Sequence, residues 1–485
     1  YQYDGGGVVS LDPKLMEMLV YRQSPYYMME DTYERNAAFY ANADYTFDRR
    51  YSISASARYD GSNQLGRGAA KRWLPTWTFA GKWIISNEAF MENASRIVDF
   101  MSLRASYGLT ANIPPSASNA MALYYNQELY RPGNAEVGIT LADLQNTELT
   151  WEKNYQLNVG FDLTLFGGRL DFNVDYFNRQ GFDLISQIKV AGIGGFMWKN
   201  ANYADLDSQG VDITLGGKMI STKDWTWSAH FTFGYSKNII RNAKNSPEVF
   251  ELVRQEGGNK NNYPVNSLFS IPFAGLNPET GIPMFYNEKG EIGYDCYMQG
   301  IETDFLKYEG QIDPKYTGGL NTTLRWKSLS MNLFFTFQAG NVIRLNPVFS
   351  SSYSDITALP NEFKDRWIMS GDEQRTDIPA IADNLMQKLY LSSAYPYNNY
   401  NYSSARVAKG DFIRLKSLSI NYELPSALVR KSRVFKRAAV RLTAKDLWLM
   451  YSDKALNGQD PEFFNTGGVA MPVQTQFVLS LDLGF

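Results

Sequence analysis

The feature that most constrains this chain is an alternation of apolar and polar residues with a period of two. In YSISASARYDGS, which begins at Tyr51, odd positions are apolar or glycine and even positions are serine, arginine or aspartate. Successive side chains of a β-strand point to opposite sides, so this pattern predicts a strand with one apolar and one polar face. The apolar face belongs either in the core of a soluble protein or against lipid.

The same alternation recurs along the whole chain. Predicted strands occupy residues 39–47, 51–60, 77–86, 101–110, 155–165, 170–177, 211–219, 225–236, 320–326, 329–340, 413–424, 440–449 and 477–485. Most approach the roughly 9–11 tilted residues of a membrane-crossing strand, whereas strands of soluble proteins average about 5–6. No run approaches the roughly 18 apolar residues of a transmembrane helix. The predicted fold class is therefore all-β, a transmembrane antiparallel β-barrel.

The connections between these strands alternate in length. Short or compact connections occupy residues 48–50, 87–100, 166–169, 220–224, 327–328 and 425–439. Much longer ones occupy residues 111–154, 237–319 and 341–412. Short periplasmic turns opposite long extracellular loops are typical of outer-membrane barrels. The pattern places residues 1–35 in an extracellular loop segment and residues 36–485 in the barrel.

The two faces of the predicted strands differ in charge. The apolar face carries no Lys, Arg, Asp or Glu except Asp446, as expected if a cation there costs about 2–4 kcal/mol at the bilayer midplane. The opposite face carries Asp44, Arg58, Asp60, Lys82, Arg104, Asp162, Asp171, Asp175, Asp212, Arg325, Arg414, Lys416, Glu423 and Asp482. A soluble barrel with an apolar interior stays open strand by strand, but the loop lengths favour the membrane. Phase slips between Leu415 and Leu418, and at Asp446 and Leu447, predict β-bulges.

Seven segments resemble, in order, the motifs of one known family. They are RYSISASARYDGS, WLPTWTFAGKWIISNEAF with MSLRASYGLTAN, SQGVDITL, YEGQIDPKYTGGLNTTL, KGDFIRLKSLSINYELP, GQDPEF and LSLDLGF. On these residues the sequence resembles the C-terminal barrel half of a SusC/RagA-type TonB-dependent outer-membrane transporter. It departs from the family at Asp446 and Leu447, where Asn-Leu is usual, and nothing in it resembles the plug domain, the TonB box or the N-terminal extension.

The resemblance implies a barrel of about 22 strands around a plugged lumen, of which about 13 are predicted here. Open sheet edges are not viable in lipid, so the plug and the other strands are expected in a segment outside this sequence. The implied partners are a SusD-like lipoprotein lid, the TonB–ExbB–ExbD complex acting through the plug, outer-membrane lipid, and a second transporter–lipoprotein pair in a dimer. The implied location is the outer membrane of a Gram-negative bacterium of the Bacteroidota type.

The expected function is active import of oligosaccharides by a SusC-like transporter. Import of oligopeptides by the same SusCD/RagAB architecture would leave the same motifs, so it stays open. A passive porin or a barrel adhesin is the alternative from another class. Plug and TonB-box sequence upstream of Tyr1 would distinguish these from the transporter.

Aromatic and amide side chains in the predicted extracellular loops are the candidate substrate contacts. They are Tyr395, Tyr397, Asn398, Tyr400 and Tyr402 in one loop, and Trp198, Tyr124 and Tyr125 in two others. Tyr rings stack on flat ligand faces and Asn amides form paired hydrogen bonds, which suits sugars and also peptide backbones. The other interpretation is a loop packed on itself at the lipoprotein interface.

The residue inventory argues against several other functions. One histidine, His230, and one cysteine, Cys296, leave little room for a catalytic Cys–His pair and exclude a zinc site built on several such residues. The acidic pairs in ADLDSQG and NGQDPEFFN do not match the EF-hand spacing. We therefore expect no enzyme activity, no metal and no cofactor. A net charge of −3 gives no electrostatic basis for binding nucleic acid.

Overall fold

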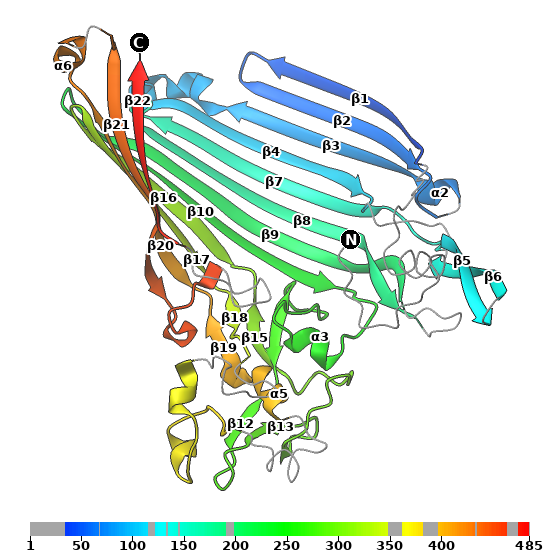
Figure 1. Ribbon diagram of the computed structural model, residues 1–485. Coiled ribbons are helices and arrows are strands. Elements are labelled where there is room, and N and C mark those ends of the chain that lie inside the picture. Colours follow the sequence, from blue (N-terminus) through cyan, green and yellow to red (C-terminus); the bar gives the residue numbers. More distant parts are fainter. Residues whose placement is uncertain are drawn as a thin grey trace.

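One antiparallel sheet of thirteen strands dominates the computed structural model, and each predicted strand is present in it (Figure 1). The structure describes residues 34–66, 68–114, 122–131, 134–143, 146–190, 198–347, 361–381, 396–431, 434–462 and 474–484. The strands are β1 (Asn36–Phe47), β2 (Tyr51–Ser62), β3 (Trp73–Ile84), β4 (Val98–Asn112), β7 (Glu152–Leu165), β8 (Leu170–Lys189), β9 (Trp198–Ser221), β10 (Trp225–Arg241), β16 (Tyr316–Trp326), β17 (Leu329–Ala339), β20 (Phe412–Glu423), β21 (Arg437–Ser452) and β22 (Gln476–Gly484). The fold class predicted from the sequence is confirmed.

The strands are adjacent in the sheet in the order in which they occur in the chain. Several extend beyond their predicted ends, and β8 and β9 are the longest, at 20 and 24 residues. Their outer parts lie beyond the predicted strands and carry polar side chains on both faces, for example Asn178, Arg179 and Gln180 on β8. Alternation therefore fades there, and the sequence pattern does not mark where these strands end.

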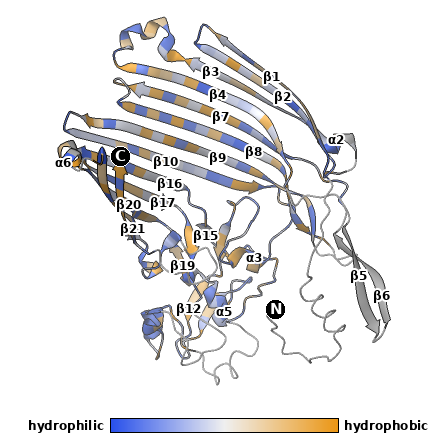
Figure 2. Cartoon of the chain, turned by 45° about the horizontal axis from the view of Figure 1, so that its top comes forward, coloured by the Kyte–Doolittle hydropathy of each residue, from blue (hydrophilic) through white to orange (hydrophobic). Residues whose placement is uncertain are grey.

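The register joins the apolar faces of neighbouring strands into continuous rows. One such row contains Ile53, Gly81, Ala105, Val159, Tyr176, Val211, Tyr235, Tyr316 and Ala339. Hydrophobic and hydrophilic residues alternate along the central strands of the sheet (Figure 2). The exposed outer side chains include Ile53, 48% exposed, and Phe79, 54% exposed. The phase of each predicted strand therefore agrees with that of its neighbours.

Tight turns join the strands at one end of the sheet. Asp48 and Arg49 both have positive φ between β1 and β2, a backbone twist that suits a short hairpin connection. Lys327 also has positive φ between β16 and β17. These short turns lie where the alternating loop lengths predicted them.

The two predicted phase slips are β-bulges. The pairing of β20 with β21 shifts register between Leu415 and Ser417, opposite Asp446, which has a φ of 50°. The Asp446 carboxylate lies 2.8 Å from the Lys416 ammonium. The bulge thereby gives the exceptional acid of the predicted apolar face a cationic partner.

The remaining elements are short, and most belong to the long connections. The strands are β5 (Ala122–Arg131), β6 (Asn134–Asp143), β11 (Ser267–Ser270), β12 (Phe273–Leu276), β13 (Pro283–Tyr286), β14 (Ile292–Gly293), β15 (Lys307–Gln311), β18 (Val342–Arg344) and β19 (Val407–Lys409). The helices are α2 (Ala69–Arg72), α3 (Val249–Val253), α5 (Pro396–Asn401) and α6 (Ser426–Lys431), with 3-10 turns η1 (Ile85–Asn87), η2 (Ala89–Ala94), η3 (Asn361–Asp365), η4 (Asp372–Gln374), η5 (Ser404–Arg406) and η6 (Lys454–Leu456). Among the described residues, no helix has the length and apolar character needed to cross a membrane.

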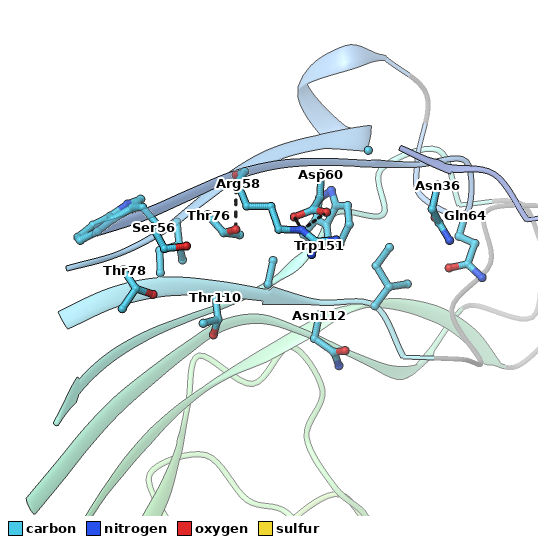
Figure 3. A pocket seen from close by; sticks show the side chains of 15 residues that line it. Asn36, Ser56, Arg58, Asp60, Gln64, Thr76, Thr78, Thr110, Asn112 and Trp151 are labelled. Carbon is cyan, nitrogen blue, oxygen red and sulfur yellow. Dashed lines mark hydrogen bonds and ion pairs between the residues drawn. The ribbon is translucent and has the colours of Figure 1, made fainter. Parts of the chain in front are cut away.

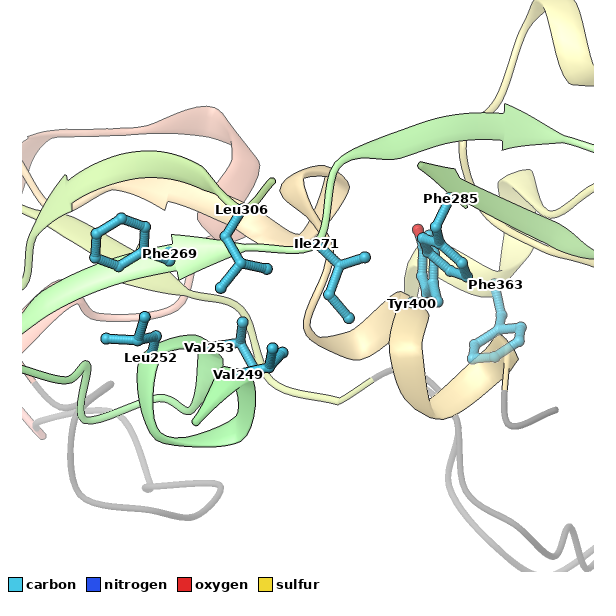
Figure 4. Packing of buried hydrophobic residues seen from close by; sticks show 9 residues of the cluster. All are labelled: Val249, Leu252, Val253, Phe269, Ile271, Phe285, Leu306, Phe363 and Tyr400. Atoms are coloured by element: carbon cyan, nitrogen blue, oxygen red, sulfur yellow. The ribbon is translucent and has the colours of Figure 1, made fainter. Parts of the chain in front are cut away.

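The main hydrophobic core lies in these connections and not in the sheet. This loop core consists of Val249, Leu252, Val253, Phe269, Ile271, Phe285, Leu306, Phe363 and Tyr400 (Figure 4). Ile271 lies between the side chains of α3 and the group around Tyr400. Segments far apart in the sequence therefore share one core at the end of the sheet opposite α6 (Figure 1).

Candidate functional site

Polar side chains on the inner face of the sheet bond to one another across strands. Ser102 Oγ donates to Asp162 at 2.9 Å, and Asn158 Nδ2 donates to Ser106 Oγ at 3.2 Å. His230 is exposed on the same face, in a smaller hollow that Asp171 also lines. The inner face is therefore a wall of hydroxyl, amide and charged groups, as the polar phase of the sequence predicted.

One ion pair on this wall crosses an intervening strand. Arg104 on β4 reaches over β7 to Asp175 on β8, where Nη2 lies 2.7 Å from Oδ1. Asp162 on β7 lies 3.5 Å from the same nitrogen. Between them β7 carries Gly160, at which a Cβ would overlap the Arg104 side chain and lie 2.5 Å from Asp175 Oδ1. Because Gly160 has no side chain, the Arg104 side chain can cross β7 and reach Asp175.

A hollow of about 550 Å³ lies on the inner wall between β1 and β4, toward the end of the sheet that carries the long loops (Figure 3). Its polar lining consists of Asn36, Ser56, Arg58, Asp60, Gln64, Thr76, Thr78, Thr110 and Asn112. Four of these side chains, those of Ser56, Thr76, Thr78 and Thr110, carry a hydroxyl group that can both donate and accept hydrogen bonds. This wall hollow can bind a ligand with many hydroxyl or amide groups.

Fixed contacts hold the wall hollow in shape. Arg58 Nε donates to both carboxylate oxygens of Asp60, at 2.6 and 2.8 Å. The indole of Trp151, which also lines the hollow, donates to the Arg72 carbonyl at 3.0 Å. Thr76 and Thr110 also donate, to the carbonyls of Arg58 and Asn154 at 3.5 and 3.3 Å. Their oxygens can still accept a hydrogen bond from a ligand.

Two of the loop candidates are core residues in this structure. Tyr397 and Tyr400 lie on α5 and are 2% and 1% exposed. The Tyr400 ring contacts Phe273 edge-on at 5.8 Å, and burial raises the pKa of its hydroxyl to about 12. Asn398, between them, is exposed. In this conformation Asn398 can meet a ligand, while the two rings pack the loop core.

The other loop candidates are spread over separate elements. Tyr402 is half-buried against the loop core, and its ring contacts Phe250 edge-on at 5.8 Å. Trp198 begins β9, while Tyr124 and Tyr125 lie on β5, which forms a hairpin with β6. Tyr395 and the side chains of Trp198, Tyr124 and Tyr125 lie outside the described residues. Contact of these candidates with substrate stays a prediction.

Buried arginines join the loops to one another. Arg344 is 2% exposed and donates to the carbonyls of Phe269, at 2.6 Å, and Ser403, at 2.9 Å. Burial lowers the pKa of this guanidinium to about 9. Arg406 is also buried and forms an ion pair with Glu362. These contacts connect segments that are distant in the sequence.

A third buried arginine joins the last long loop to the barrel. Arg414 on β20 forms an ion pair with Asp460, and its Nε lies 3.1 Å from Glu462. Lys416 on the same strand lies 3.5 Å from Glu462. The acidic pair of NGQDPEFFN, Asp460 and Glu462, is therefore paired with two cationic side chains of the protein.

The other acidic pair also has protein partners. Asp205 accepts from the backbone N–H of Asp183 at 3.1 Å and from Asn242, and Asp207 lies 3.2 Å from Arg241. Within the described part of the chain, no three His, Cys, Asp or Glu side chains are grouped so as to hold a metal ion.

The sequence pattern points to candidate contacts in the loops and does not single out the wall hollow. The available signal was the run of small hydroxyl residues at even positions, Ser52, Ser54 and Ser56 on β2 and Thr76 and Thr78 on β3. Such a run marks a polar wall. Only the register shows that three of its members, Ser56, Thr76 and Thr78, converge with β4 on the wall hollow.

Comparison with known proteins agrees with this architecture. The family described as "TonB dependent receptor-like, beta-barrel" matches residues 18–377. A "TonB-dependent receptor P3" from Formosa agariphila is 27% identical over 87% of this chain and 41% of the relative. "TonB-dependent receptor SusC" from Bacteroides thetaiotaomicron is 24% identical over 47% of this chain and 22% of the relative. The chain spans less than half the length of these curated relatives.

Solved structures show the same fold. One described as "Structure of the RagAB peptide transporter" superposes with a TM-score of 0.75 at 24% identity, covering 93% of this chain and 48% of the other. Another, of the RagAB peptide importer in the "closed-closed" state, gives a TM-score of 0.72 over the same share of each chain. With a thirteen-strand sheet, an apolar outer face and a family match over most of its length, this chain belongs to the β-barrel family of TonB-dependent receptors.

Proposed function

We propose that this chain is part of an outer-membrane transporter that actively imports oligosaccharides. The observation that supports this proposal best is the wall hollow, whose lining combines hydroxyls, amides and the indole of Trp151. Sugars present hydroxyl groups around an apolar ring face. Hydroxyl and amide side chains bond the former, and an aromatic ring packs on the latter.

We also propose that a SusD-like surface lipoprotein covers the long loops and that a TonB complex acts through a plug. Support for a covering partner comes from large apolar side chains exposed on the loops. Tyr297, Ile301 and Met369 are 65%, 65% and 64% exposed. Exposed apolar side chains of this size are often buried by a partner.

The loop candidates have different parts in this proposal. Asn398, being exposed, would hydrogen-bond substrate at the mouth of the barrel. Tyr397 and Tyr400 would act indirectly, because their burial holds α5 in place. Trp198, Tyr124, Tyr125, Tyr395 and Tyr402 remain proposed contacts in the surrounding loops.

Purification of the full-length protein from its native membrane in mild detergent tests the proposal. Mass spectrometry of the preparation should identify a co-purifying lipoprotein and a ladder of hexose masses. Bound peptides would instead establish the oligopeptide importer. An isolated barrel that conducts ions in planar bilayers would establish the porin and overturn the proposal.

A matched pair of variants tests the wall hollow itself. Thr78→Val removes one hydroxyl from the hollow and should weaken substrate affinity about three- to tenfold, the value of one hydrogen bond. Thr232→Val makes the same change on the inner wall outside the hollow. Calorimetry should therefore show ordinary affinity for the control, and equal losses in both variants would contradict a role for the hollow.

A further inference from the structure

Aromatic rings mark the level at which the outer face of the sheet leaves the hydrocarbon. On β3, β4 and β7, the rings of Trp77, Tyr107 and Tyr155 follow one another with centroids 5.6 and 6.4 Å apart. Farther round the sheet, Tyr235 of β10 and Tyr316 of β16 lie 5.4 Å apart. Such amphipathic rings sit at the headgroup level of a membrane.

Between these two aromatic groups the outer face is mostly polar, with Phe182 of β8 and Ile239 of β10 as apolar exceptions. The register sets Asn178 of β8 opposite Gln209 of β9, and Gln209 opposite Lys237 of β10. The next outward-facing row sets Gln180 opposite Asp207. These residues are in the same alternation phase as the lipid-facing Tyr176, Val211 and Tyr235, so they face outward and not into the lumen.

The depth of this polar segment follows from strand geometry. With a rise of about 3.3 Å per residue and a tilt of about 40°, the stretch of β10 from Trp225 to Tyr235 spans about 25 Å of membrane thickness, the height of a typical apolar band. Lys237 lies about 5 Å beyond that band, and Arg241 about 15 Å beyond it. The strand end leads into a long loop, so the polar segment faces the headgroups of the outer leaflet.

The polar segment forms a hollow of about 290 Å³ with a cation in it. This girdle hollow is lined by the polar residues Asn178, Gln180, Asp207, Ser208, Gln209, Lys237 and Arg241, and by one apolar residue, Ile239. Arg241 Nε lies 3.2 Å from the Asp207 carboxylate, and its positive charge balances the negative charge of that group. Lys237 is half-buried, and its ammonium forms no ion pair or hydrogen bond within the part of the chain that the structure describes. Two cations and one carboxylate leave the girdle hollow with one net positive charge.

We propose that the girdle hollow binds the phosphorylated sugar headgroup of an outer-leaflet glycolipid. Lys237 supplies a point charge for the phosphate, and the amides of Asn178, Gln180 and Gln209 hydrogen-bond sugar hydroxyls. Its position above the apolar band excludes acyl chains as the main ligand. The inference rests on the proposed outer-membrane location and is independent of which substrate is imported.

Lipopolysaccharide binding to the delipidated full-length protein in detergent tests this assignment. Native mass spectrometry should show that Lys237→Gln lowers the affinity for added lipopolysaccharide about fivefold, equivalent to about 1 kcal/mol for one cation near a charged surface. Lys327→Gln removes a cation from a turn at the opposite rim and should leave the affinity unchanged. A heat-dependent gel shift would establish that both variants are folded barrels.

Three outcomes would overturn the proposal. They are unchanged lipopolysaccharide binding by Lys237→Gln, an equal loss in Lys327→Gln, and an equal loss of binding to phosphatidylglycerol vesicles, which would mean that the hollow attracts any anionic lipid. Uptake of the transported substrate is measured separately. A failed import assay with intact lipopolysaccharide binding would count against the proposed function alone.

Discussion

The side chain of Ile53 faces lipid, and the side chain of its neighbour Ser54 faces the lumen. Substitutions at these two residues therefore test the assignment of faces. Ile53→Arg should destabilise the folded barrel by about 1–2 kcal/mol, because Ile53 lies between a turn and the bilayer midplane. The midpoint temperature of the heat-dependent gel shift measures this loss in the full-length protein.

Ser54→Arg is the matched control on the inner wall. Ser54 donates a hydrogen bond to Asp44, so an arginine there would find an acidic partner and water. We expect a gel-shift midpoint close to that of the wild type. If both arginines were equally tolerated, or equally damaging, the inside and outside of the sheet would be assigned wrongly.

Cys296 is half-buried against the loop core, and burial raises the pKa of its thiol to about 12. At pH 8 only about one thiol in 10,000 is then ionised, and the thiolate is the reactive form. Iodoacetamide should therefore alkylate Cys296 slowly in the folded protein and rapidly after denaturation, as measured by mass spectrometry. Equal rates in the two states would contradict the burial of this thiol.

The pH dependence of stability has a defined sign at this residue. The folded-state pKa of Cys296 lies above its ordinary value of 9.0. The contribution of the thiol to folding free energy is therefore complete below pH 9 and is lost as the pH rises toward 12.

At the scale of single strands, the Arg104–Asp175 ion pair depends on Gly160 of β7. Gly160→Ala should displace the guanidinium and lower barrel stability by about 1 kcal/mol, a common cost for a crowded position. Gly81→Ala is the control, because a Cβ there would approach only the Ser52 carbonyl, at 4.0 Å. Equal gel-shift midpoints for the two variants would contradict this account.

The connection after β21 depends in the same way on Arg414, which is buried with Asp460 and Glu462. Arg414→Ala leaves these carboxylates without their main partner, a change that typically costs about 3–5 kcal/mol for a buried pair. The loop should then be cut faster by protease added to intact cells. Arg375→Ala removes an arginine whose side chain is 79% exposed in its pair with Asp372, so it should leave cleavage unchanged.

At the scale of the whole molecule, the two ends of the sheet should lie on opposite sides of the outer membrane. Lys289, beyond β13, and Lys223, in the turn before β10, are both exposed. A membrane-impermeant maleimide should label Lys289→Cys in intact cells, and Lys223→Cys only after the outer membrane is permeabilised. Labelling of Lys223→Cys alone in intact cells would mean that the barrel is inverted.

The strands, their faces and the two bulges could be predicted from the sequence because the alternation of apolar and polar residues reflects two environments, lipid and lumen. Ile53 is apolar because it faces lipid, and Ser54 is polar because it faces the lumen. The slip at Asp446 was visible because a bulge inserts one residue into that period. Each of these features depends on neighbours within a few residues.

The site depends on contacts between distant residues, and these leave no local pattern. The tyrosines of α5 suggested an exposed binding loop, yet Tyr400 is covered by Phe273 and Phe285, which come from another connection. The wall hollow likewise needs the register of β2, β3 and β4. Composition could suggest the chemistry of these side chains but not which of them meet.

The strand order has a consequence for how such proteins diversify. Strands β10 and β16 pair directly although the chain between them contains α3 and β11 to β15. The entropic cost of closing a connection grows by only about 0.6 kcal/mol for each doubling of its length. Insertions at this rim can therefore accumulate over evolution without disturbing the wall, so new recognition surfaces can arise on an old scaffold.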